Sequence, residues 1–378
     1  MLINIHKSVF DNKNIWNESE TIPALENLAN AVREGKHLVI SDRKTLGIIA
    51  NCQDLSKTTQ AIYNMLYNKF SELRSYLSVV TRYIEITDIL EPRLISLSGK
   101  EVIQVPLGFF ENTESIQKTI LLCENSRDTF FYQTVARVYV IWQKINIKIE
   151  CESRGGGGNT INIEYDNIQQ KTKRLCLCIL DSDRISPEGK LGSTAALIAS
   201  IDQNQNSQFF RTKVFILDVH EIENLIPDSI LIEICSKNKE REDAMKRIKT
   251  LQEISGYQIK HFLDIKQGTL MYKIFNSTNP KDQSFWENRI LEINTILKCI
   301  NNDCLADWKC KIKNPKNHCQ CQISLGFGEH TLDNTIEYLE KIEPHKIARE
   351  FNNDMKPEWE KIGQVVVDFC IAHSPIRA

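Results

Sequence analysis

Two carboxylates follow an apolar stretch near the middle of the chain, and their spacing suits cation chemistry. Residues 175–180 are all apolar, and Asp181 and Asp183 come directly after them. Side chains two residues apart in an extended chain project to the same side. Two like charges held that close raise each other's pKa unless a cation neutralises them. The pair therefore predicts a site for a hard cation, Mg²⁺ or Mn²⁺, which prefers carboxylate oxygens.

An acidic segment also lies upstream, ahead of four consecutive glycines. Residues 147–151 alternate apolar and polar side chains, which predicts a strand. Only the acid nearest the end of this strand can reach the edge of a sheet, so Glu152 is the expected catalytic and metal-binding acid and Glu150 the second candidate. The glycines at 155–158 either let the main chain approach a phosphate or form a surface hairpin.

A third acidic segment follows the apolar run at 214–217. Its Glu223 is the expected fourth metal ligand, and Glu221 is a second candidate. Ligands bind at the carboxyl ends of strands in an open parallel sheet, so the three segments are expected to meet at one edge. The structural alternative is that Asp181 caps the next helix and Asp183 pairs with Arg184 at the surface.

The composition is that of a globular protein without a global basic field. Hydrophobic residues make up 42% and charged residues 25% of the 378 residues, and the formal net charge is -2. No apolar run approaches the roughly 20 residues that cross a bilayer. The first residues lack the pattern of a secretion signal. With 12 cysteines and no such signal, we expect reduced thiols, a cytoplasmic location and no membrane partner.

The sequence predicts an α/β protein in which a mostly parallel sheet is flanked by helices. We expect an N-terminal α/β domain of unknown role at 1–125, a catalytic domain at 126–235 and a mostly helical region with a Cys-rich loop at 236–378. Helical spacing predicts helices at 24–32, 56–77, 128–143, 240–254, 284–300, 331–342 and 358–372, and strands are predicted at 37–41 and 83–87.

Asp42 follows the first predicted strand and admits two interpretations. It either caps a helix that starts near Lys44 or belongs to a second nuclease-like site. No second and third acid align with it, which favours the cap.

Cysteines crowd into the stretch from 299 to 321. Zinc sites use four Cys or His ligands, commonly in closely spaced pairs. The candidate ligands of a structural Zn²⁺ are Cys304, Cys310, Cys319 and Cys321. Buried or free thiols are the alternative, because the spacing of the last two is shorter than a usual zinc pair.

The order of these acids resembles the Toprim fold of topoisomerases, primases and the nucleases of the overcoming-lysogenization-defect group. The segment at 220–225 is similar to the "IEN" segment of Toprim-like nucleases in bacterial anti-phage systems, the DUF4435 type. The resemblance covers roughly residues 145–230. It assigns Glu152 as the strand-end glutamate, Asp181 and Asp183 as the acid pair, and Glu223, with Glu221 second, as the later acid. The family's Glu-Gly-x-x-Asp is here Glu-Ser-Arg-Gly-Gly, without the Asp.

The resemblance implies a Mg²⁺-dependent endonuclease that hydrolyses phosphodiester bonds in DNA or RNA as the effector of an anti-phage defence system. It also implies an ATPase subunit in trans, since this chain has no phosphate-binding loop of the Gly-x-x-x-x-Gly-Lys-Ser/Thr type. Self-association into a homo-oligomer stays open. The alternative function is a non-catalytic scaffold or nucleic-acid-binding subunit of such a defence complex.

Overall fold

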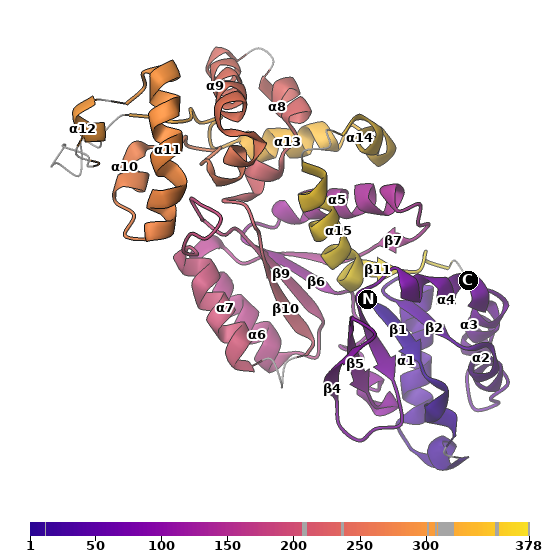
Figure 1. Cartoon of the computed structure of the whole chain (residues 1–378). Helices are drawn as coiled ribbons and strands as arrows, with labels where there is room; N and C mark the ends of the chain where they lie inside the picture. Colours follow the sequence, from indigo (N-terminus) through magenta and orange to yellow (C-terminus); the bar gives the residue numbers. More distant parts are fainter. Residues whose placement is uncertain are drawn as a thin grey trace. The chain divides into compact units, whose positions relative to one another are not determined.

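The computed structural model describes residues 1–11, 13–205, 210–235, 238–300, 302–306, 308, 321–351 and 355–376. The chain forms two compact units, and Figure 1 labels most of their helices and strands. Unit 1 comprises Met1–Ile179, Ile198–Phe215 and Glu360–Ala378, and unit 2 comprises Leu180–Leu197 and Ile216–Trp359. Within the described ranges, no helix is both long and apolar enough to cross a membrane.

Unit 1 begins with a five-stranded sheet in the order β2-β1-β3-β5-β4. Its strands are β1 Leu2–Ile5, β2 Leu38–Ser41, β3 Arg82–Ile86, β4 Arg93–Leu97 and β5 Lys100–Val105. Neighbours pair in parallel except β4, which runs antiparallel to β5. Its helices are α1 Thr21–Arg33, α2 Arg43–Ala50, α3 Lys57–Asn68 and α4 Phe70–Ser75. The strands predicted at 37–41 and 83–87 and the helix at 24–32 are confirmed.

Two local expectations in this region have different outcomes. Asp42 caps α2, because its carboxylate accepts hydrogen bonds from the backbone N–H of Thr45 at 3.0 Å and from the Thr45 hydroxyl at 2.6 Å. The structural interpretation of Asp42 is therefore confirmed. The single helix predicted at 56–77 is wrong, because the backbone leaves helical geometry at Lys69 (φ -103°, ψ 10°) and divides it into α3 and α4.

A second sheet has the order β10-β9-β6-β8. Its strands are β6 Ile120–Cys123, β8 Glu152–Gly155, β9 Cys176–Leu180 and β10 Thr212–Ile216, and the associated helices are α5 Asp128–Trp142, α6 Ile161–Lys171 and α7 Ser193–Gln205. Strand β6 runs parallel to both β8 and β9, and α5 packs against β6 and β8. Every residue of β9 is buried, as expected for a parallel strand covered on both faces. The α/β prediction is confirmed.

The sheet also bears on two expected boundaries. Strand β6 lies before residue 125, so the parallel sheet starts ahead of the expected beginning of the catalytic domain. The strand predicted from 147 to Glu152 is wrong. That stretch contains only β7 (Lys148–Ile149), which pairs antiparallel with β11 (Ile371–Ala372), and β8 starts afresh at Glu152.

Unit 2 is mostly helical. Its helices are α8 Asp228–Cys235, α9 Lys239–Ser255, α10 Met271–Phe275, α11 Pro280–Leu297, α12 Asn302–Ala306, α13 Thr331–Leu339 and α14 Pro344–Glu350, and α15 Lys356–Cys370 leads back into unit 1. The fully buried Trp286 and Trp359 belong to the core of unit 2. The 3₁₀ turns among the described residues of both units are η1 Lys7–Phe10, η2 Lys13–Asn17, η3 Tyr76–Ser78, η4 Leu107–Phe110, η5 Gly158–Thr160, η6 Ile222–Leu225 and η7 Tyr257–Phe262. The helices predicted at 128–143, 240–254, 284–300, 331–342 and 358–372 are confirmed within a few residues at their ends.

A buried ion pair in unit 2 leads to a stability prediction. The ammonium of Lys260 is fully buried and donates to Asp228 at 2.6 Å and to the Ile226 carbonyl at 2.6 Å. We expect Asp228→Asn to lower the free energy of unfolding by about 3–5 kcal/mol, because it leaves a buried ammonium without its counter-ion. Urea denaturation measures this change.

A double variant and a surface pair serve as controls for that prediction. Asp228→Asn combined with Lys260→Met is expected to recover most of the loss, because no buried charge then remains unpaired. Glu188→Gln removes an exposed pair to Lys281 and is expected to change the free energy of unfolding by less than about 1 kcal/mol. Equal effects of Asp228→Asn and Glu188→Gln would contradict the assignment.

Candidate active site

The acid pair lies in a loop that begins directly after β9. Ser182, between the two acids, is fully buried and donates its hydroxyl to the Val219 carbonyl at 2.5 Å. The backbone N–H of Asp183 donates to the His220 carbonyl at 2.9 Å. Asp181 accepts a 2.9 Å hydrogen bond from the backbone N–H of Ile222. The loops after β9 and β10 are thus joined by one hydrogen bond between main-chain atoms and by two between a side chain and the main chain.

Asp183 has an unusual backbone conformation that a glycine makes possible. Its φ is 53°, in the left-handed region that side-chain-bearing residues seldom adopt. A Cβ at Gly192 would lie 2.0 Å from the Asp183 carboxylate, so only glycine leaves room for this side chain. Such strain accumulates where a function fixes the geometry. The Asp183 side chain is exposed, and its backbone is held by the hydrogen bond to the His220 carbonyl.

We expect Gly192→Ala to displace the Asp183 carboxylate and to lower any metal-dependent cleavage about a hundredfold, because small misplacements of reacting groups are costly. Cleavage rates of the purified variant measure the effect. Gly47→Ala is the matched control, because a Cβ there makes only an ordinary 3.4 Å contact with Tyr67. A Gly192→Ala protein that cleaves at the unchanged rate would contradict the role of this loop geometry.

The loop after β10 brings two buried glutamates to one lysine. The ammonium of Lys266 lies 3.1 Å from Glu223 and 3.8 Å from Glu221. Glu221 also accepts hydrogen bonds from the backbone N–H groups of Ile265 at 2.8 Å and Lys266 at 3.0 Å. Asn224 donates to the carbonyls of Lys260 and Leu263, which anchors the loop.

The electrostatics of this cluster indicate an excess of negative charge. Burial and the charges of Glu223 and Asp264 raise the pKa of Glu221 to about 8. Burial acts to lower the pKa of Lys266, but the charges of Glu223, Glu221 and Asp181 hold that pKa above its usual value. Asp181 and both glutamates therefore act on the same ammonium. Among the described residues, the second carboxylate oxygen of Glu223 is buried without a hydrogen-bond partner.

Glu152 and Glu150 lie in a different setting from the one expected. Glu152 is level with Ile120 and hence with Cys176, at the amino ends of the parallel strands, because β8 starts at this residue. Its carboxylate is paired with Arg154 at 2.5 Å and Arg174 at 2.6 Å. Glu150 is paired with lysines on either side, Lys118 at 3.0 Å and Lys148 at 3.2 Å. The expectation that Glu152 ends a strand is wrong.

Another acid that follows a parallel strand is Glu124, which was not among the residues predicted from the sequence. It comes directly after β6, the neighbour of β9 in the sheet. The signal was available: the apolar run at 120–123 ends in Glu124, and Asp128 follows four residues later. This spacing fits the Glu-Gly-x-x-Asp pattern that is missing after Glu152, with Asn125 in place of the glycine.

Glycines of the four-glycine run line a cavity together with Glu124. The cavity has a volume of about 520 Å³, and Asn125 and Ser126 complete its wall. Gly157 and Gly158 have φ values of 71° and 63°, which only glycine adopts without cost. Both the cavity and these glycines belong to unit 1. The run is therefore a tight turn between β8 and α6 beside an acidic residue.

The structure bears differently on the two predicted metal sites. Within the described ranges, no three His, Cys, Asp or Glu side chains gather closely enough to hold a metal ion. The buried, unsatisfied oxygen of Glu223 and the raised pKa of Glu221 nevertheless suit the approach of a cation. Of the expected zinc ligands, Cys304 and Cys321 form no disulfide among the described residues, and Cys310 and Cys319 lie outside those residues. Zinc binding stays a prediction.

Comparisons with protein-family models, with curated proteins and with solved structures found no match to this chain.

Proposed function

We propose that this protein is a Mg²⁺-dependent, Toprim-like nuclease, an effector of a bacterial anti-phage system that hydrolyses phosphodiester bonds in DNA or RNA. The proposal rests on the hydrogen bonds that join the loop after β9 to the loop after β10. The strained loop with Asp181 and Asp183 is bonded to the loop with Glu223, and Lys266 lies among their charges. Carboxylates that follow neighbouring parallel strands are the arrangement in which such sheets bind ligands.

The residues of this chain have distinct tasks in the proposed reaction. Asp181 and Asp183 are the proposed metal ligands, and Glu223 offers its free oxygen as a further donor. Mg²⁺, when bound, activates water and neutralises charge on the phosphate. Lys266 supplies a fixed positive charge for a phosphate oxygen. In the net reaction the oxygen of water would bond to phosphorus, the bond from phosphorus to the departing oxygen would break, and one proton of the water would end on that departing oxygen.

Glu152 is not part of the proposal, because its carboxylate is already paired with Arg154 and Arg174. We expect Glu152→Gln to leave Mg²⁺-dependent cleavage of DNA or tRNA unchanged, and a loss of cleavage in this variant would contradict its exclusion.

The test of the function is a cleavage assay of the full chain with DNA and with tRNA, in Mg²⁺ and in excess chelator. The protein is assayed alone and together with an ATPase subunit, because the resemblance implies such a partner in trans. Cleavage that requires Mg²⁺ supports the proposal. No cleavage of either substrate under any of these conditions would refute it.

The second candidate function is a non-catalytic scaffold or nucleic-acid-binding subunit of a defence complex. Its support is that no three metal-ligating side chains gather among the described residues. A scaffold would bind nucleic acid or its partner without any dependence on Asp181 and Asp183. Filter binding of the wild type and of a variant lacking both carboxylates distinguishes this function from the nuclease.

A further inference from the structure

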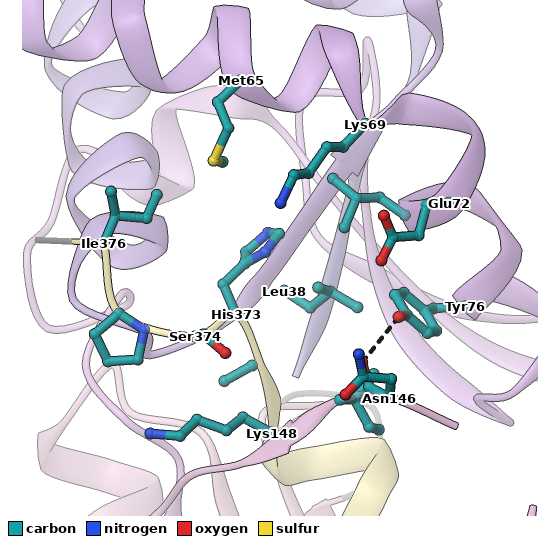
Figure 2. Close-up of a pocket in the computed structure, with 14 residues that line it drawn as sticks. Leu38, Met65, Lys69, Glu72, Tyr76, Asn146, Lys148, His373, Ser374 and Ile376 are labelled. Carbon is teal, nitrogen blue, oxygen red and sulfur yellow. Dashed lines mark hydrogen bonds between the residues drawn. The ribbon is translucent and has the colours of Figure 1, made fainter. Parts of the chain in front are cut away.

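A second cavity, of about 500 Å³, lies in unit 1, and none of its lining residues belongs to the proposed nuclease site (Figure 2). It is bounded by the end of α3, by α4 and η3, by β7 and by the segment that follows β11. Pockets for small molecules usually have volumes of about 300–1,000 Å³. The size of this cavity therefore suits a small organic ligand.

One part of the wall is apolar. Leu38, Leu73 and Ile147 contribute to it, and Met65 adds a flexible thioether. Leu38 and Leu73 are almost completely buried, at 2% and 5% exposure, so they form a fixed surface. Tyr76 is held beside them by its hydroxyl, which donates to the Asn146 carbonyl at 2.9 Å. Such a wall accommodates a flat ring.

Another part of the cavity wall carries one positively and one negatively charged side chain, Lys69 and Glu72. Figure 2 shows the ammonium of Lys69 directed toward the His373 ring and the carboxylate of Glu72 beside Tyr76. Within the described part of the chain, neither the Lys69 ammonium nor the Glu72 carboxylate forms a hydrogen bond or ion pair. Lys148 also lines the cavity, but its ammonium is shared with Glu150 at 3.2 Å.

His373 adds a neutral polar group to this cavity. Its ring nitrogen Nε2 lies 3.2 Å from the backbone nitrogen and 3.1 Å from the carbonyl of Val39, which fixes the ring. Burial, with a contribution from the charge of Lys69, lowers the pKa of His373 to about 4, so the imidazole is neutral at neutral pH. Lys69 is therefore a lysine of the cavity wall whose charge acts on this ring.

The ligand that matches these features carries three kinds of group. An anion would satisfy Lys69 and benefit from Lys148, and hydroxyl or amino groups would donate to Glu72. A planar ring would lie on Leu38, Leu73 and Ile147. An acyl chain would leave Glu72 without a donor, and a free phosphate would leave the apolar wall exposed. We propose that this cavity is a binding site for a nucleoside monophosphate, with Lys69 on the phosphate and Glu72 on hydroxyl or amino groups.

The test is calorimetric titration of the full chain with the four 5′-ribonucleoside monophosphates, with inorganic phosphate and with adenosine. At least one monophosphate is expected to bind at least tenfold more tightly than phosphate or adenosine. Lys69→Met is expected to weaken that binding at least tenfold, because it removes the unpaired ammonium. Lys44→Met, which replaces an exposed lysine of α2 outside the cavity, is the matched control and is expected to bind as the wild type does.

Two further measurements separate this site from the proposed nuclease site. A variant with Asp181→Asn and Asp183→Asn is expected to bind the monophosphate unchanged, whereas a reaction product held at the nuclease site would lose affinity. In NMR spectra the pKa of His373 is expected to rise when the monophosphate binds, because the phosphate offsets the charge of Lys69. Equal affinity of the wild type and Lys69→Met, or binding no tighter than that of phosphate and adenosine, would overturn the proposal.

Discussion

Asp181→Asn combined with Asp183→Asn is expected to lower Mg²⁺-dependent cleavage about a thousandfold or more without unfolding the protein. Loss of the proposed metal site would remove several kcal/mol of transition-state stabilisation, and about 4 kcal/mol corresponds to three powers of ten in rate. Asparagine keeps a side-chain oxygen for the hydrogen bond from the Ile222 backbone, so the loop is expected to persist. Single-turnover cleavage rates measure the effect.

The control for this experiment is a carboxylate of α9 that lies outside the proposed site. Asp243→Asn changes an exposed aspartate of α9 that is paired with surface lysines, and it is expected to leave the cleavage rate unchanged. Urea denaturation of both proteins checks that folding is intact. Cleavage that survives the double change at an undiminished rate would refute the proposed site, whichever nucleic acid is the substrate.

The parts of the site that could be read from the sequence are those with a local signal. The run that ends in Asp181 is a fully buried parallel strand, and such strands appear in a sequence as continuous apolar stretches. The loop at 220–225 was recognised by a short motif, and the structure joins it to the acid pair by backbone hydrogen bonds. Both assignments depended on residues close together in the chain.

Glu152 was misplaced because alternation is an ambiguous signal over five residues. The stretch at 147–151 alternates as a half-buried strand does, yet only Lys148 and Ile149 pair, and they pair with β11 from the other end of the chain. The pairing partner of a two-residue strand cannot be inferred from its own sequence. Glu124 was overlooked because β6 is only four residues long, and short apolar runs do not distinguish strands from buried helical segments.

Lys266 had no local signal at all. It follows Glu223 by more than forty residues in the chain, in a loop after η7. The structure brings it to the acids because Glu221 accepts hydrogen bonds from the backbone of this loop. The pattern of residues along the sequence cannot reveal a lysine that reaches the site through tertiary contacts. Lys266 is therefore the main addition that the structure makes to the site within unit 2.

Lys266→Met is therefore expected to impair both catalysis and stability, and the two effects have different pH dependences. We expect kcat to fall about a hundredfold or more, because a fixed positive charge is lost at the site where the phosphate would react. Lys266→Arg is expected to restore part of this activity, since it returns the charge. Lys273→Met, which removes a neighbouring lysine paired with Asp264, is the control and is expected to cleave normally.

The stability effect follows from the sign of the Glu221 shift. The pKa of Glu221 in the folded protein, about 8, lies above its ordinary value of 4.5, so folding favours its protonated form and loses stability as pH rises from about 4.5 to about 8. Lys266 opposes this rise in pKa, and its removal extends the loss to higher pH. Urea denaturation is expected to show a larger destabilisation of Lys266→Met, relative to wild type, at pH 8.5 than at pH 6, by up to about 1 kcal/mol. An equal destabilisation at both pH values would mean that Lys266 does not compensate these carboxylates, and its role beside the phosphate would lose its basis.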